Sequence, residues 1–277
     1  MSSSSSVHPE SQAGFAKNTE LYNQVRSGYP VEALSLLRKA VSNKGPLDVV
    51  EIGVGTGIFT RGLLTHPDWA TAIGTLRAVE PNEGMRETFE KHTTDPRVVL
   101  ADGTFEATGA ESGSTDVIAI ATAFHWCLDI PAALTEFLRI LKPNGVLCLI
   151  WTGQDSDCTP WLKQVVSIAE ARENAASPNA RTEKWRDLFS LPAYTESFSE
   201  TLEEQVFRWG IPVKAEDVFN KVLTASRVSA LPEQEKEVVL RDVRAVLDKG
   251  EGMVWVDEQQ GKFELPQMCR VVISKRK

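Results

Sequence analysis

The chain has 277 residues, of which 42% are hydrophobic and 25% are charged, and both values are ordinary for a soluble globular protein. Its net charge of −8 argues against nucleic acid or an anionic membrane as the main partner, but it does not exclude a small-molecule acceptor. No apolar run is long enough to cross a membrane, so no membrane association is expected.

The N-terminal part of the chain predicts a tail followed by helices. Residues 1–14 are rich in serine and lack the basic and apolar regions of a signal peptide, so we expect a disordered tail. Residues 15–30 show helical spacing that Gly28 and Pro30 end, and residues 31–41 predict a second helix. Together they form a predicted N-terminal helical cap over residues 15–45.

The stretch from Val49 to Thr60 changes from a strand pattern to a helix pattern at three alternating glycines. A tight strand-to-helix turn collects backbone N–H groups beside the positive end of the helix. Glycines at such a turn also allow a ligand to approach the backbone, because no Cβ stands in the way. We therefore expect a ligand-binding turn here.

The spacing of the glycines indicates which ligand this turn suits. The dinucleotide fingerprint requires a glycine one residue after Gly57, and the phosphate loop requires a Gly-Lys pair; both are absent. The remaining pattern, Glu51-x-Gly53-x-Gly55-x-Gly57, has a carboxylate that would repel a pyrophosphate and attract an ammonium or sulfonium group. An ordinary glycine-rich turn of another α/β protein is the alternative. The pattern resembles motif I of the class I S-adenosylmethionine-dependent methyltransferases.

The next two predicted strands each end at an acidic residue, Glu80 before Pro81 and Asp102 before Gly103 and Thr104. The ends of these strands lie beside the glycine turn in a doubly wound sheet. The resemblance implies that Glu80 accepts the ribose hydroxyls of the cofactor. It also implies that Asp102 accepts the adenine amine, with the next backbone N–H on a ring nitrogen. A helix-start carboxylate at Glu80 and a plain turn at Asp102 are the alternatives.

An N-terminal motif adds to this resemblance. The string Tyr22-x-x-x-Arg26-x-x-Tyr29-Pro30 is similar to Y-x-x-x-R-P-x-Y-P of the trans-aconitate-like small-molecule methyltransferases, with Ser27 in place of the first proline. The resemblance implies that Arg26 and Tyr22 meet the methionine carboxylate and that Tyr29 lines the acceptor side. A guanidinium group matches both oxygens of a carboxylate. Alternatively, Arg26 is a solvated helix-end cation and the tyrosines only pack.

Residues 114–123 predict a fourth strand that is buried on both faces, and its end at Ala121 and Thr122 should face the methionine part of the cofactor. Phe124-His125-Trp126 follow directly, and the family has a His-Trp pair in this place. His125 is the candidate general base, because its ordinary pKa suits proton transfer near neutrality. A structural histidine is the alternative, and Trp126 is expected to form a pocket wall.

The rest of the chain predicts the acceptor side. A helix over residues 132–141, a Leu-Lys-Pro-Asn-Gly turn and a strand over 146–151 complete a cofactor-binding core of residues 46–151, and Trp151 at the strand's exit is expected to line the acceptor pocket. Residues 152–277 predict acceptor-side cap helices and paired terminal strands. The predicted elements are helices over residues 161–171, 215–225 and 233–247 and strands over residues 203–209 and 268–274.

Together these patterns predict an α/β, Rossmann-like class I methyltransferase fold as a single domain over residues 15–277. We expect a mostly parallel seven-stranded sheet with helices on both faces and an antiparallel C-terminal edge strand. The resemblance implies S-adenosyl-L-methionine as cofactor. The residues expected to bind it are Tyr22, Arg26, Glu51, Gly53, Gly55, Gly57, Glu80, Pro81, Asp102, Gly103, Thr104, Ala121 and Thr122, and those expected to face the acceptor are Tyr29, His125, Trp126 and Trp151.

The acceptor is expected to be a small metabolite. The N-terminal motif, the His-Trp pair and Leu265-Pro266 also resemble the fungal gliotoxin bis-thiomethyltransferases, which implies S-methylation of a dithiol of secondary metabolism. An O-methyltransferase of a carboxylate or hydroxyl, and a binding or pericyclic protein that transfers no methyl group, are the alternatives. Asp155 and Asp157 lack further suitably placed ligands, so no metal is expected. The four cysteines show no metal-ligand spacing and are interpreted as reduced thiols of a cytoplasmic monomer or weak homodimer.

Overall fold

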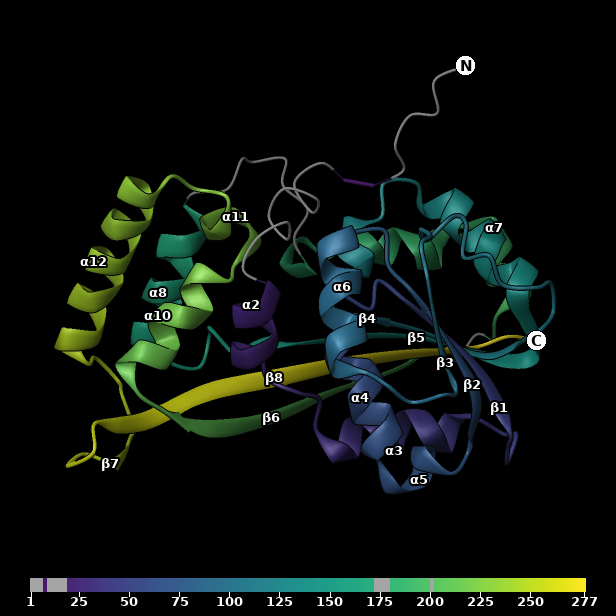
Figure 1. The fold of residues 1–277 in the computed structure, drawn as a ribbon, viewed down its shortest axis with the longest axis horizontal. Coiled ribbons are helices and arrows are strands. Elements are labelled where there is room, and N and C mark those ends of the chain that lie inside the picture. The colour runs from purple at the N-terminus through teal and green to yellow at the C-terminus, as the bar shows by residue number, and fades with distance from the viewer. Residues whose placement is uncertain (1–6, 9–18, 172–179, 200–201) are drawn as a thin grey trace, which may run out of the picture.

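A mixed sheet with helices on both faces forms the centre of the computed structural model, which describes residues 7–8, 19–171, 180–199 and 202–277 (Figure 1). The strand order is β3-β2-β1-β4-β5-β8-β6, and the short β7 pairs with β8. The first five strands are parallel, whereas β8 is antiparallel to β5 and β6. The strands are β1 Leu47–Ile52, β2 Ile73–Val79, β3 Val98–Ala101, β4 Thr115–Ala121, β5 Leu141–Gln154, β6 Glu203–Val213, β7 Trp255–Asp257 and β8 Lys262–Lys275.

This topology confirms the predicted fold class. Strand order reverses between β1 and β4, which are neighbours in the sheet, so the crevice above their carboxyl ends is the position where doubly wound sheets bind ligands. β4 is buried along most of its length, as its continuous apolar run predicts. The C-terminal β8 lies inside the antiparallel part of the sheet, and β6 is the outermost strand there.

Helices cover the two faces of the sheet with separate apolar clusters. One face packs against α3 Val31–Ala40, α4 Ile58–Thr65 and α5 Pro67–Ala70, which contribute Leu37, Phe59 and Trp69. The other face packs against α7 Ile130–Ile140 and α9 Pro192–Ser197, together with a 3₁₀ segment at Lys184–Ser190. α5 lies between α4 and β2, where the sequence pattern predicts no element.

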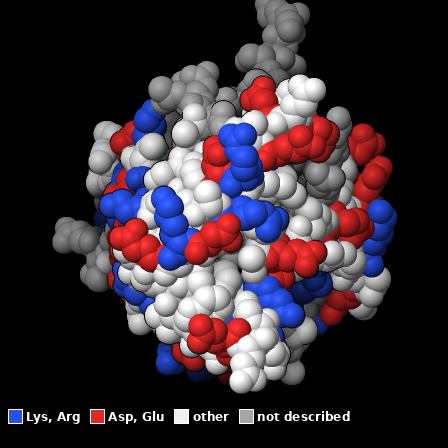
Figure 2. All heavy atoms as spheres, turned by 90° about the vertical axis from the view of Figure 1, so that its left-hand side faces the viewer, with Lys and Arg blue, Asp and Glu red and all other residues white. Residues whose placement is uncertain are grey.

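A cap of four helices stands on the far part of the long β6–β8 ribbon (Figure 1). It consists of α8 Pro160–Glu170, α10 Ala215–Leu223, α11 Ser226–Ser229 and α12 Glu233–Lys249. Valines of these helices pack on Phe263 and Leu265 of β8 in a third apolar cluster. The cap end of the molecule carries acidic and basic side chains interspersed over its face (Figure 2). The four cap helices thus share an apolar cluster of their own on the ribbon that extends from the main sheet.

Three strands are longer than their sequence patterns predict, because they continue beyond the main sheet into this ribbon. Pairing of β5 with β8 extends to Gln154 and Gln267, and pairing of β6 with β8 reaches Val213 and Phe263. Polar residues and Pro212 interrupt the apolar pattern there, since one side of the ribbon faces solvent. Hydrophobic periodicity therefore locates these three strands but not their ends.

The N-terminal cap contains α2 Thr19–Val25, which stands between the cap helices and α6 Glu83–His92 (Figure 1). The predicted start of this helix at residues 15–18 and most of the predicted tail lie outside the described residues. Among the residues that the structure does describe, no helix combines the length and apolarity that a bilayer crossing needs.

Candidate active site

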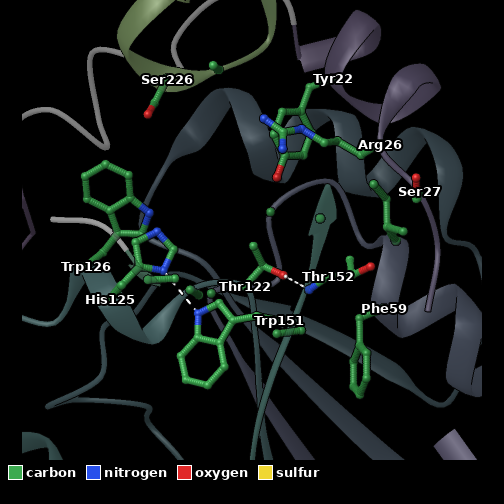
Figure 3. Close-up of a pocket in the computed structure, with 18 of the residues that line it drawn as sticks. Tyr22, Arg26, Ser27, Phe59, Thr122, His125, Trp126, Trp151, Thr152 and Ser226 are labelled. Atoms are coloured by element: carbon green, nitrogen blue, oxygen red, sulfur yellow. Dashed lines mark hydrogen bonds between the residues drawn. The ribbon is translucent and has the colours of Figure 1, made fainter. Parts of the chain in front are cut away.

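A cavity of about 690 Å³ opens above the carboxyl ends of β1, β2, β4 and β5 (Figure 3). The sheet forms its floor, and α2, α8, α10 and α11 contribute to its walls. Most of the predicted site residues line this cavity: Tyr22, Arg26, Tyr29, Glu51, Gly53, Gly55, Glu80, Pro81, Thr104, Ala121, Thr122, His125, Trp126 and Trp151. Gly57, Asp102 and Gly103 are not among its lining residues.

The glycine turn after β1 has a left-handed backbone. Gly53, Gly55 and Gly57 have φ values of 74°, 55° and 83°, a region that residues with a Cβ rarely adopt. A Cβ at Gly53 would lie 2.5 Å from the Cβ of Ala123, whereas a Cβ at Gly55 would meet no atom within 4 Å. Gly55 therefore leaves open space beside the cavity, and Gly57 instead caps α4 against Phe89.

Glu80 is fixed at the end of β2 by two backbone donors. Its Oε2 accepts a hydrogen bond of 2.9 Å from the Gly55 N–H, and its Oε1 accepts one of 2.9 Å from the Asn82 N–H. The residue is 8% exposed, and burial raises the pKa of its carboxyl group. Asn82 caps α6 by accepting from the Met85 N–H, so it fixes where that helix begins. The carboxylate is thus held rigidly against the glycine turn and lines the cavity.

Glu51 at the end of β1 is fully buried beneath the same turn. Its Oε2 accepts a hydrogen bond of 2.6 Å from Thr60, while its Oε1 is buried and has no partner in the structure. Burial raises the pKa of this carboxyl group to about 8. A buried carboxylate oxygen without a donor is costly, and a positively charged ligand group would satisfy it. This arrangement fits the amino group of a bound ligand.

The N-terminal motif brings Arg26 and Tyr22 to the cavity wall (Figure 3). The Arg26 guanidinium lies 4.7 Å from the centroid of the Tyr22 ring and donates from Nη2 to the Thr224 carbonyl at 3.1 Å. Its Nε is buried and has no hydrogen-bond partner among the residues that the structure describes. The alternative of a solvated helix-end cation therefore does not hold for Arg26.

Tyr29 follows in the same segment and is hydrogen-bonded to Thr122 through its hydroxyl, with 3.0 Å between the oxygens. Thr122 has a φ of 54°, which is unusual for a β-branched residue. Its backbone N–H donates to Ile150, and its hydroxyl accepts from the Thr152 N–H at 3.3 Å (Figure 3). These bonds hold a strained turn at the end of β4, where the cavity floor lies.

Asp102 does not reach the cavity, contrary to the resemblance. Its side chain is 73% exposed and pairs with Arg86 of α6 at 3.4 Å, on the outer side of β3. Gly103 packs tightly, since a Cβ there would lie 2.7 Å from the Ala107 carbonyl oxygen. Thr104 and Phe105, one turn later, line the cavity instead. A strand-end aspartate in a sequence does not show which side of the turn its carboxylate faces.

His125 lies at the other end of the cavity in a 3₁₀ turn, Phe124–Trp126 (Figure 3). Its Nδ1 accepts a hydrogen bond of 3.3 Å from Nε1 of Trp151, and an indole nitrogen is a donor only. The neutral ring therefore carries its proton on Nε2. Burial, and next the positive charge of Arg227, lower the pKa of His125 to about 3. In this arrangement the neutral His125 ring can donate a hydrogen bond from Nε2, and its role as a general base stays a prediction.

Several cavity residues come from the last third of the chain, where the sequence analysis predicts no site residue. Trp185 lies beside Trp151, with the ring centroids 4.4 Å apart and the ring planes tilted by 36°, and Lys221, Arg227 and Gln267 also line the cavity. Their only signal in the sequence is their residue type, because their approach depends on how the cap packs. In the described part of the chain, no three His, Cys, Asp or Glu side chains are grouped to hold a metal ion. Asp155, one of the two aspartates considered for a metal, accepts from Arg208 at 2.8 Å.

Comparisons with known proteins agree with this geometry. Residues 50–149 match the family model of a methyltransferase domain. An uncharacterised methyltransferase-like protein of Schizosaccharomyces pombe is 29% identical over 219 residues, which are 79% of each chain. A malonyl-[acyl-carrier protein] O-methyltransferase of Halalkalibacterium halodurans is 32% identical over 152 residues, 51% of this chain and 54% of that protein.

Among solved structures, a putative type II methyltransferase from Anaeromyxobacter dehalogenans superposes with a TM-score of 0.60 at 20% identity, covering 90% of this chain and 97% of that one. The fold and the cavity thus define a Rossmann-like class I methyltransferase architecture. The domain match and the relatives support placing this chain among the methyltransferases of that class.

Proposed function

We propose that this chain is an S-adenosylmethionine-dependent methyltransferase that methylates a small-molecule acceptor. The observation that carries the proposal is the pair of buried carboxylates around the glycine turn, Glu51 with an unpartnered oxygen and Glu80 held by the Gly55 N–H. This pair suits a cationic nucleoside, because a positively charged ligand group favours the ionised form of both carboxyl groups, and these ionised groups would repel a diphosphate. Open space beside Gly55 leaves room for the ligand to lie against the backbone.

The residues present fit the parts of this cofactor. Glu80 would accept from the ribose hydroxyls, Glu51 would face the ammonium group, and Arg26 would meet the carboxylate. The cofactor supplies an activated methyl group on a sulfonium, so the protein has to provide alignment and exclusion of water. Trp126 and Trp151 bring apolar surface to the acceptor end of the cavity.

The acceptor we favour is a thiol, specifically the thiols of a dithiol secondary metabolite such as reduced gliotoxin. A thiol is partly ionised near neutral pH and needs no general base, which suits a site whose histidine is held neutral with Nδ1 already occupied. The Nε2–H of His125 would donate to the acceptor and orient it. An aliphatic hydroxyl is less suited, since it would require a base in this position.

A carboxylate is the second candidate acceptor. It too is ionised at neutral pH, and the basic residues Arg26, Lys221 and Arg227 line the cavity. The partial similarity to a malonyl-[acyl-carrier protein] O-methyltransferase points the same way, although this chain spans about half the length of that relative.

Two measurements test the proposal. Calorimetry should show that the protein binds S-adenosylhomocysteine, and absence of binding would refute the cofactor assignment. Incubation with a labelled methyl donor and a mixed panel of dithiols, monothiols, carboxylates and catechols should then label thiols most strongly, as read by mass spectrometry. Label on carboxylates alone would favour the second candidate, and cofactor binding without label on any class would favour a protein that transfers no methyl group.

A further inference from the structure

A polar cluster on the cavity wall is not explained by the contacts described so far. It joins Ser27, which stands where the related motif has proline, to two residues far along the chain. The Ser27 hydroxyl donates to Oε1 of Gln267 at 2.8 Å, and Nζ of Lys221 lies 2.9 Å from the Ser27 hydroxyl and 3.3 Å from the same Gln267 oxygen. All three residues line the cavity.

Lys221 is a partly buried cation that has no ion-pair partner among the described residues. Its hydrogen bonds go to neutral oxygens, and among the described residues no carboxylate lies within ion-pair distance of its Nζ. Burial, and next the charge of Arg26, lower the pKa of Lys221 to about 8. Holding an ammonium group there costs free energy that the negative charge of Asp217 offsets only in part.

Arg26 lies beside Lys221 and, among the described residues, also has no carboxylate at ion-pair distance. Its Nη2 bonds only to a backbone carbonyl at the end of α10, the helix that carries Lys221, and its Nε has no partner. Two like charges from different elements thus approach each other at one wall of the cavity. Like charges are brought together in this way where a ligand anion is to bridge them.

We propose that Arg26 and Lys221 together bind one carboxylate of a ligand in the cavity, with Ser27 and Gln267 holding the Lys221 ammonium group in position. The inference rests on the proposed function and extends it to a residue of the cap. Two sources can supply the carboxylate, the methionyl end of the cofactor or the acceptor. In either case α10 contacts the bound carboxylate through Lys221, and the carbonyl of its C-cap residue accepts a hydrogen bond from Arg26.

The test uses Lys221→Met, which keeps the aliphatic stem and removes the charge, with Lys163→Met on the exposed side of α8 as the control. Calorimetry compares S-adenosylhomocysteine with 5′-methylthioadenosine, which lacks the carboxylate. If the cofactor supplies the carboxylate, Lys221→Met lowers affinity for the first ligand about 10- to 100-fold and leaves the second unchanged. The ratio of the two affinities is insensitive to a general loss of folded protein.

The second arm saturates the protein with S-adenosylhomocysteine and measures succinate binding by ligand-observed NMR, with succinamide as the neutral counterpart. If the acceptor supplies the carboxylate, succinate binds to the wild type, succinamide does not, and Lys221→Met loses the preference. Lys221→Arg should keep part of the preference for the carboxylate ligand that Lys221→Met loses. Ser27→Ala should lose part of the same preference. A Lys221→Met protein that changes neither preference overturns the inference, whereas a wild type that binds no S-adenosylhomocysteine refutes the proposed function first.

Discussion

Protonation of His125 offers a direct test of the site's electrostatics. In the folded protein its pKa is lowered to about 3, while an unfolded histidine titrates near its ordinary value of about 6.5. Below about pH 6.5 the unfolded chain therefore binds a proton that the folded chain refuses. The folded state loses stability as the pH falls through this window, and it gains nothing from His125 above it.

The size of the effect follows from the difference between the two pKa values. A solution at about pH 5 is about 1.5 pH units below the pKa of the unfolded imidazole, and each unit corresponds to about 1.4 kcal/mol. At this pH the unprotonated His125 therefore lowers the free energy of unfolding by about 2 kcal/mol. His125→Asn removes the titration and keeps an oxygen to accept from Trp151. The wild type should therefore lose about 2 kcal/mol more than this variant between about pH 7.5 and about pH 5.

Urea denaturation followed by fluorescence of the seven tryptophans measures this difference. The control is His92→Asn, which removes a half-exposed histidine on α6 that pairs with Glu20 at 2.9 Å. Equal pH dependence in the wild type and in His125→Asn would show that His125 is readily protonated in the folded state, and the argument that it is a donor would fail with it.

Three further substitutions test the cofactor half of the cavity by calorimetry with S-adenosylhomocysteine. Gly55→Val should abolish binding, because the new side chain fills the open space in the turn. Backbone strain at a φ of 55° should also lower the free energy of unfolding by about 1–2 kcal/mol. Retained binding would place the nucleoside elsewhere. Glu80→Gln should weaken both S-adenosylhomocysteine and adenosine about 10-fold, and a loss confined to S-adenosylhomocysteine would contradict a ribose contact. Asp102→Ala should leave affinity within about twofold, since the exposed carboxylate faces Arg86, and a large loss would show that it turns inward on binding.

The two carboxylates Glu51 and Glu80 were predictable because the carboxyl ends of parallel strands meet at one edge of a sheet. Each ends a buried apolar run, so locating the strand also locates the acid. Asp102 obeys the same rule in the sequence but fails in the structure. Its strand, β3, is the outermost of the parallel strands and its turn faces α6, so position along the chain determines the edge of the sheet but not the direction of the side chain.

The cavity residues that come from the cap and from β8 were not predictable in this way. Lys221 and Gln267 reach the cavity only because the β6–β8 ribbon extends past the main sheet and carries the cap back over it. That extension is paired through residues whose pattern is half polar, and periodicity does not distinguish such pairing from a loop. The substitution of Ser27 for proline was visible as a departure from a motif. Its consequence, a hydroxyl that bonds Lys221 across 194 positions of the chain, required the tertiary structure.

The neutral His125 ring and the basic residues of the cavity together bear on how an acceptor would lose its proton. With this low pKa, His125 is poorly suited to remove a proton near neutral pH, whereas Arg26, Lys221 and Arg227 bring positive charge to the cavity. A positive potential lowers the pKa of an acidic acceptor, so a thiol entering this cavity would ionise more readily than in water. The cap would thereby do through its charges what a general base does by proton transfer, and the released proton would pass to solvent. Turnover of a thiol should then follow the pKa of the acceptor, and a series of thiols of graded acidity in which rate is insensitive to that pKa would contradict this mechanism.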